Sequence, residues 1–148
     1  MRDKQRRPSN PHLYINPTLT VTTSAPPEIA VAALVDALID ARFRLQERGP
    51  VRARLRNGGW LRAFLVHDER LSMFLPRRFA TWGFVATVDL EALDTAPPTQ
   101  VRVRMRRLTE PEDAVLHILR AVDAAMRALY AAGHHVEGGE VGEGWRLR

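Results

Sequence analysis

Two segments of the chain alternate arginine with apolar residues. They read Val51-Arg52-Ala53-Arg54-Leu55-Arg56 and Val101-Arg102-Val103-Arg104-Met105-Arg106. In a β-strand successive side chains point to opposite faces, so each segment places three arginines on one side and three apolar groups on the other. The two segments therefore predict a sheet with an apolar inner face and a strongly cationic outer face. Beyond a basic α+β domain, this pattern specifies no function.

Further strands are predicted from runs of β-branched and aromatic residues separated by turn signals. The first strand is expected at residues 18–23, and the others follow at residues 43–47, 60–67, 71–75 and 79–90. Together with two helices, they predict the α+β class. We expect an antiparallel six- to seven-stranded sheet that is packed on one face by an N-terminal helix and a long C-terminal helix.

The two helices are predicted from apolar residues at helical spacing. The first is expected to run to about residue 42, with Ser24 as its cap and two prolines in its first turn. The second begins with a capping box, in which Thr109 caps the helix and Glu112 reaches back. Gly133 is well placed to end it.

The chain of 148 residues is long enough to form one domain with its own core. Residues 1–16 are polar and charged without periodicity and predict a flexible basic tail. Residues 17–133 are expected to form the single α+β domain. Residues 134–148 are rich in glycine and charge, which predicts a loose C-terminal tail.

The formal net charge is +5 and the sequence pI is about 10.8, which favours anionic partners. Lys4 is the only lysine, so arginine supplies all the other basic side chains. This bias is typical of a GC-rich genome, in which arginine is the default solvated residue. Two interpretations of the arginines therefore stay open: a binding face, or an ordinary solvated face.

The absence of cysteine excludes disulfides, thiolate metal sites and a cysteine nucleophile. No apolar run approaches the roughly 20 residues of a membrane-spanning helix. The N-terminus has no apolar segment of the kind found in signal peptides. The expected location is cytoplasmic.

Residues suited to catalysis or metal binding occur only in weak arrangements. His134 and His135 are adjacent, so they cannot share one helical face as a preformed zinc site would require. Asp89, Glu91 and Asp94 are expected at a strand end and in its loop, exposed to solvent. The sequence thus predicts no catalytic residue, no metal site and no cofactor, and it favours a non-enzymatic protein.

The order of elements over residues 18–132 is a strand, a helix, about six antiparallel strands and a long C-terminal helix. This order resembles the helix-grip architecture of START and Bet v 1-type proteins. The resemblance implies a curved sheet that wraps the last helix and encloses an apolar cavity. Members of that superfamily bind lipids, sterols, polyketides or other apolar molecules, and some catalyse cyclisation or hydrolysis.

A turn signal at residues 57–59 leaves two hairpin registers open. With a two-residue loop, Leu55 and Trp60 point inward, and Arg62 lines the interior as an anchor for an acidic group. With a loop one residue longer, Leu55 faces Leu61, and Trp60 joins the arginines outside. That second arrangement would form a stacking platform for single-stranded nucleic acid.

Three functions follow from these alternatives. The first is a non-enzymatic protein that holds a small apolar or acidic ligand between the curved sheet and the C-terminal helix. Its candidate ligand-binding residues are Arg62, Trp82, Phe84, Met105, Val122 and Met126. The second is binding of nucleic acid or another polyanion through the outer face, with Arg52, Arg54, Arg56, Trp60, Arg102, Arg104 and Arg106 as candidates. The third is an assembly subunit, including a homo-oligomer, without chemistry of its own.

Overall fold

The computed structural model describes residues 16–58, 85–109, 111–139 and 141–142. Its elements are β1 (Thr18–Thr23), α1 (Pro27–Asp40), β2 (Arg44–Arg48), β3 (Arg52–Asn57), β4 (Ala86–Ala92), β5 (Thr99–Arg106), α4 (Pro111–Ala131) and β6 (Val136–Gly138). The described strands form one six-stranded sheet in the order β2-β3-β4-β5-β1-β6. Every pairing is antiparallel, which confirms the predicted α+β class.

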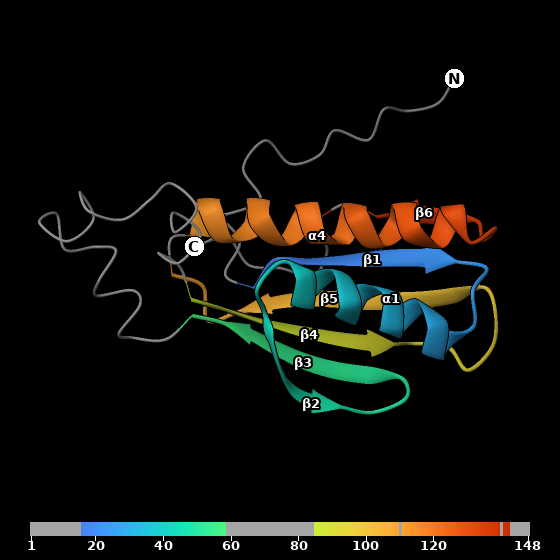
Figure 1. The fold of residues 1–148 in the computed structure, drawn as a ribbon, viewed down its shortest axis with the longest axis horizontal. Helices are drawn as coiled ribbons and strands as arrows, with labels where there is room; N and C mark the ends of the chain where they lie inside the picture. Colours follow the sequence, from blue (N-terminus) through green and yellow to red (C-terminus); the bar gives the residue numbers. More distant parts are fainter. Residues whose placement is uncertain (1–15, 59–84, 110, 140, 143–148) are drawn as a thin grey trace, which may run out of the picture.

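The two described helices pack against each other and share one apolar core with the sheet. Figure 1 shows α1 lying across the sheet and the axis of α4 running roughly parallel to β1 in this view. α1 contacts β2, β3, β4 and β5, whereas α4 contacts β6 at the far edge. Neither of these helices is long and apolar enough to cross a membrane.

Both arginine-alternating segments form strands with the predicted orientation. On β5, Val101, Val103 and Met105 are completely buried, while Arg102 and Arg104 are exposed. β3 has the same alternation, with its apolar residues buried between its arginines. The period of two along each segment therefore matches an inner face packed on the core and an outer face turned away from it.

The predicted cap of α1 is wrong. The helix begins at Pro27 with Pro26 as its N-cap residue, and no side chain caps it. Ser24 lies too early, and its hydroxyl accepts a hydrogen bond from the His135 N–H over 2.8 Å. The Ser24 N–H in turn donates to the His135 carbonyl over 3.0 Å. Ser24 thus joins the start of α1 to the segment that follows α4.

The capping residue predicted for α4 also has another role. α4 begins at Pro111, which places Thr109 before the capping position. The Thr109 hydroxyl accepts a hydrogen bond from the Val85 N–H over 2.7 Å, and the Thr109 N–H donates to the Val85 carbonyl over 2.9 Å. Thr109 therefore connects the approach to α4 with the residue just before β4.

Both helices end in the same hydrogen-bonded turn. At the end of α4, Gly133 has a φ of 92°, and the His134 N–H donates to the Leu129 carbonyl over 3.1 Å. This arrangement confirms Gly133 as the stop. At the end of α1, Arg42 takes the corresponding left-handed conformation with a φ of 75°. The Phe43 N–H donates to the Leu38 carbonyl over 2.9 Å, as in the first case.

Neither hairpin register predicted at residues 57–59 describes the pairing of β3. Leu55 lies opposite Leu45 on β2 and opposite Val88 on β4, so both edges of β3 are occupied. Asn57 lies opposite Ala86, which comes from much later in the chain. The local turn signal favoured the nearest following segment, but a distant strand takes that edge. Residues 60–65, on which the two registers differed, lie outside the described residues.

Part of the segment expected to be a loose C-terminal tail forms β6. This strand pairs with β1 at the edge of the sheet, where Thr22 lies opposite Glu137. The Gly139 N–H then donates to the Thr20 carbonyl over 2.8 Å. A Cβ on Gly139 would lie 2.9 Å from the Thr20 oxygen, so the absence of a side chain permits this close approach.

Candidate nucleic-acid interface on the outer sheet face

All six candidate arginines lie on the outer face of three adjacent strands. We call this surface the arginine face and define it by those outward residues of β3, β4 and β5 that lie opposite one another across the three strands. These residues are Arg52, Arg54, Arg56, Thr87, Asp89, Glu91, Arg102, Arg104 and Arg106. β4 lies between the two arginine-bearing strands, so its outward side chains determine how much of the positive charge is neutralised.

The antiparallel register arranges the arginine face in three rows across the strands. In the first row, Thr87 lies between Arg56 and Arg106. In the second row, Asp89 lies between Arg54 and Arg104, and in the third, Glu91 lies between Arg52 and Arg102. Two of the three rows therefore carry a central carboxylate, and the first carries a hydroxyl.

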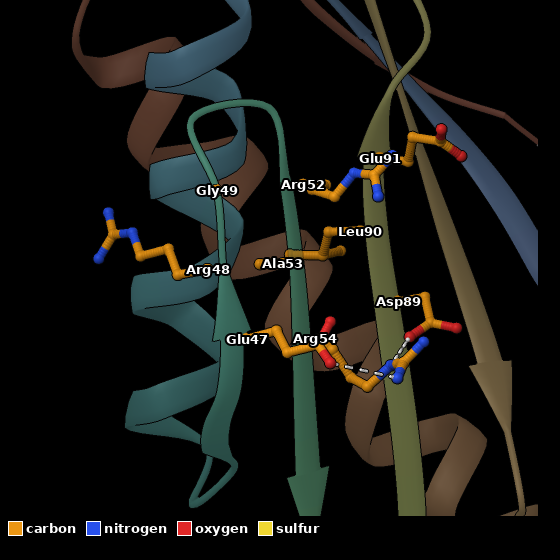
Figure 2. Close-up of a pocket in the computed structure, with 9 residues that line it drawn as sticks. All are labelled: Glu47, Arg48, Gly49, Arg52, Ala53, Arg54, Asp89, Leu90 and Glu91. Atoms are coloured by element: carbon orange, nitrogen blue, oxygen red, sulfur yellow. Dashed lines mark hydrogen bonds and ion pairs between the residues drawn. The ribbon is translucent and has the colours of Figure 1, made fainter.

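Asp89 holds arginines from both neighbouring strands. Arg54 Nε donates to Asp89 Oδ1 over 2.9 Å, and Arg106 Nε forms an ion pair with Asp89 Oδ2. Glu47 on β2 lies 3.7 Å from Arg54 on its other side, and Figure 2 shows Arg54 between these two carboxylates. The hydrogen bond to Asp89, followed by the attraction of the same carboxylate, raises the pKa of Arg54 above its ordinary value.

The row of Glu91 is held more loosely. Arg102 Nη1 lies 4.0 Å from Glu91 Oε2, and both side chains are about half exposed, at 48% and 52%. An ion pair with this exposure is screened by solvent and contributes little to stability. Figure 2 shows Arg52 extended towards Glu91 from the other side. The charged groups of Glu91 and Arg102 are therefore accessible to solvent.

Two hollows lie on this side of the sheet. The first has a volume of about 380 Å³ and is lined by Glu47, Arg48, Gly49, Arg52, Ala53, Arg54, Asp89, Leu90 and Glu91. Figure 2 shows that Arg48 points away from the other charged residues there. The second has a volume of about 270 Å³ and is lined by Gln46, Glu47, Arg54, Arg56, Thr87, Arg106 and Arg107. Each hollow is lined by more than one arginine.

The described residues of the small-ligand hypothesis lie in or beside the core. Met105 is fully buried, and Val122 is 2% exposed. Met126 is half-buried, and its Cε lies 3.1 Å from the position that a Cβ on Gly138 would occupy. Arg62, Trp82 and Phe84 lie outside the described residues, as does Trp60 of the nucleic-acid hypothesis. A ligand between the sheet and α4 stays a prediction.

Two of the described histidines have side-chain partners within the fold. His117 Nε2 lies 2.7 Å from the Ala41 carbonyl at the end of α1, and its ring stacks on Phe43. His135 Nε2 lies 3.1 Å from Glu137 Oε1 on the exposed edge of the sheet. Within the described residues, no group of three or more histidine, cysteine or acidic side chains is arranged to hold a metal ion.

The sequence motifs indicated which arginines share a face, but they did not indicate which residues of other strands lie beside those arginines. The alternation of arginine with apolar residues identified both arginine-bearing strands. Nothing in the sequence placed β4 between them. Asp89 and Glu91 were expected at a strand end and in a loop, but both lie within β4. The chain matches no protein-family model, no curated protein and no solved structure. Its function is therefore argued from the geometry of the arginine face.

Proposed function

We propose that this protein is a non-enzymatic binding protein whose arginine face binds nucleic acid. One observation carries the proposal: six arginines share one face of three adjacent strands, against two carboxylates from the strand between them. The excess of positive charge supports binding of a polyanion, because phosphate groups attract arginine and release their counterions on binding.

The extent of the arginine face favours a polymer over a small acid. Outward residues along one strand are about 7 Å apart, and β3 and β5 are about 10 Å apart. Three rows therefore cover roughly 14 by 10 Å, which exceeds the size of one carboxylate or phosphate group. A chain that carries repeated phosphates can contact several rows at once.

The chemistry of the described face favours contacts to the backbone over contacts to bases. The residues of the arginine face are arginines, two acids and a threonine, and none of them carries an aromatic ring. Guanidinium groups bind phosphate oxygens with paired hydrogen bonds. Contacts to phosphates position a protein on nucleic acid but carry no sequence information. We expect binding to depend strongly on salt and weakly on sequence.

The test is a fluorescence titration of a labelled single-stranded oligonucleotide between about 50 and 300 mM salt. For a single strand, the logarithm of the affinity falls with the logarithm of salt by about 0.7 for each phosphate neutralised. The double variant Arg52→Gln/Arg56→Gln removes two exposed arginines of the face. It is expected to reduce this slope by roughly 1.4 and to lower the affinity at 0.1 M salt roughly 10- to 30-fold.

The matched control is Arg120→Gln/Arg127→Gln, which removes two exposed arginines from α4 and the same net charge. This control is expected to bind nearly as well as the wild-type protein. Equal weakening by the two double variants would mean that only net charge matters, and would overturn the arginine face as the binding surface. Absence of binding at the lowest salt concentration would overturn the function itself.

A further inference from the structure

The arginine face already shows how it holds an anionic group. Asp89 projects from β4 and is bound by Arg54 from β3 and by Arg106 from β5. A single oxyanion on the central strand is thus held by guanidinium groups from both of its neighbours. Arg54 lies opposite Asp89 in the same row, whereas Arg106 reaches it from the neighbouring row, opposite Thr87.

The first row has no carboxylate. Thr87 takes the central place, directly opposite Arg56 and Arg106. Thr87 is 5% exposed and lines a hollow between the two arginine-bearing strands. This hollow has a volume of about 270 Å³, whereas roughly 10–15 Å³ by the same measure is enough to hold one water molecule.

The backbone brings a further arginine to this hollow. Arg107 directly follows β5, and its φ of 52° turns the chain into the left-handed region. Arg106 and Arg107 consequently line the same hollow, although neighbouring residues of a regular strand point to opposite faces.

The charges around the hollow are predominantly positive. Of the carboxylates near it in the described chain, Glu47 and Asp89 already pair with Arg54, and Asp89 also pairs with Arg106. Arg44 on β2 lies opposite Arg56 and adds a further positive charge to this end of the sheet. Within the described residues, no carboxylate forms an ion pair with Arg56 or Arg107.

We propose that Arg56, Thr87, Arg106 and Arg107 bind a single phosphate group. The proposal rests on the function proposed above when the phosphate belongs to a nucleic-acid backbone, in which case this row anchors the strand on the arginine face. Free inorganic phosphate shares the same chemistry, and the experiment below separates the two sources. Arginine donors and a threonine hydroxyl suit the tetrahedral oxygens of phosphate, since all of them donate hydrogen bonds to it.

The direct test is Thr87→Asp, which places a carboxylate where the phosphate would lie. Because this residue would lie directly opposite Arg56 and Arg106, a carboxylate there would have two arginines within its row, and we expect the variant to fold. Its affinity for the labelled oligonucleotide is expected to fall at least fivefold at 0.1 M salt, the contribution of about one phosphate contact. The matched control is Gln100→Glu, which adds the same charge at an exposed outward position of β5. It is expected to weaken binding less than twofold.

Inorganic phosphate provides the second readout. At about ten times its Kd, phosphate is expected to raise the melting temperature of the wild-type protein by roughly 3–5 °C. General salt effects are shared by all variants, but the shift due to the site is lost in Thr87→Asp. Arg56→Gln, at an exposed position that does not affect the core, is expected to lose the shift as well. Arg127→Gln on α4 is expected to keep it.

The two proposals fail in distinguishable ways. If the wild-type protein binds the oligonucleotide and Thr87→Asp weakens it no more than Gln100→Glu, the phosphate site is overturned and the arginine face stands. If phosphate raises the melting temperature and Thr87→Asp abolishes the rise, but the oligonucleotide does not bind, the site stands for free phosphate and the nucleic-acid function is overturned. If neither ligand has an effect, both proposals are overturned.

Discussion

Asp89 lies directly opposite Arg54 in the antiparallel pairing of β3 and β4, and Arg54 Nε donates a hydrogen bond to Asp89 Oδ1 over 2.9 Å. The same carboxylate pairs with Arg106, whose side chain is 24% exposed. Asp89 therefore has two opposing effects. It orders the arginines around it, and it competes with any external anion for their hydrogen-bond donors.

We expect Asp89→Asn to bind the oligonucleotide more tightly than the wild-type protein, by about fivefold at 0.1 M salt, because it releases donors equivalent to one phosphate contact. Its stability should fall slightly, because the arginines lose their ordered partner. The same titration and a urea denaturation measure the two effects. Asp94→Asn, in an exposed loop, removes the same charge. Equal gains in affinity from the two variants would show that Asp89 does not compete for the arginines.

The contribution of the Arg54–Asp89 pair should not weaken at alkaline pH. The hydrogen bond to Asp89 raises the pKa of Arg54, which is already far above neutral for an arginine. A group whose pKa is raised by folding stabilises the fold below its unfolded pKa and loses this contribution only as the pH rises through its folded pKa. That window lies beyond ordinary working pH.

The measurement is the difference in unfolding free energy between the wild-type protein and Arg54→Gln at neutral pH and at about pH 9.5. We expect the difference to be the same at both. A difference that shrinks at the higher pH would show that another titrating group, and not the guanidinium of Arg54, governs the interaction.

The sequence located the outer face because alternation along one strand is a local property. Arg102 and Arg104 are exposed and Val103 is buried for the reason that the pattern indicated. The neighbouring strands of a given strand cannot be predicted in this way, because they depend on which distant segments of the chain pack together. Nothing near Arg54 in the sequence indicates that Asp89 will lie opposite it. The row in which the Asp89 carboxylate offsets arginine charge could therefore not be predicted.

The errors at the helix starts have a local physical cause. Ser24 was expected to cap α1, but the two prolines that follow it shift the first helical residue to Pro27. Ser24 and Thr109 are both polar residues just before a helix, and both bond to backbone groups elsewhere in the fold. The helix ends were better determined, because Gly133 takes the left-handed conformation that few other residues adopt readily.

Arg42→Gly is expected to stabilise the protein. Arg42 has a φ of 75° just after the end of α1. The corresponding position after α4 is occupied by Gly133, which also has a positive φ. An L-residue in this conformation costs about 1–2 kcal/mol. The greater freedom of glycine in the unfolded chain offsets about 0.4–1 kcal/mol of the gain. We therefore expect a net increase of roughly 0.5–1 kcal/mol in the unfolding free energy.

The control for this effect is Gly133→Ala, measured in the same urea denaturation. A Cβ at Gly133 would meet no atom within 4 Å, so any loss reflects the backbone conformation alone. We expect a loss of about 1 kcal/mol. If Arg42→Gly destabilises the protein while Gly133→Ala behaves as expected, the Arg42 side chain makes a contribution that outweighs its backbone strain.

Gly139→Ala is expected to detach β6 from the sheet. The added Cβ would lie 2.9 Å from the Thr20 carbonyl oxygen, a backbone atom that accepts the Gly139 N–H and cannot move without disturbing β1. Overpacking of this kind costs about 1–3 kcal/mol. A short edge strand can avoid the clash by separating, so amide hydrogen exchange at residues 136–139 should accelerate while exchange in β5 stays slow. Gly138→Ala is the control, because its Cβ would meet the flexible end of Met126 at 3.1 Å. Equal exchange in the two variants would mean that the close approach to Thr20 does not hold β6 in place.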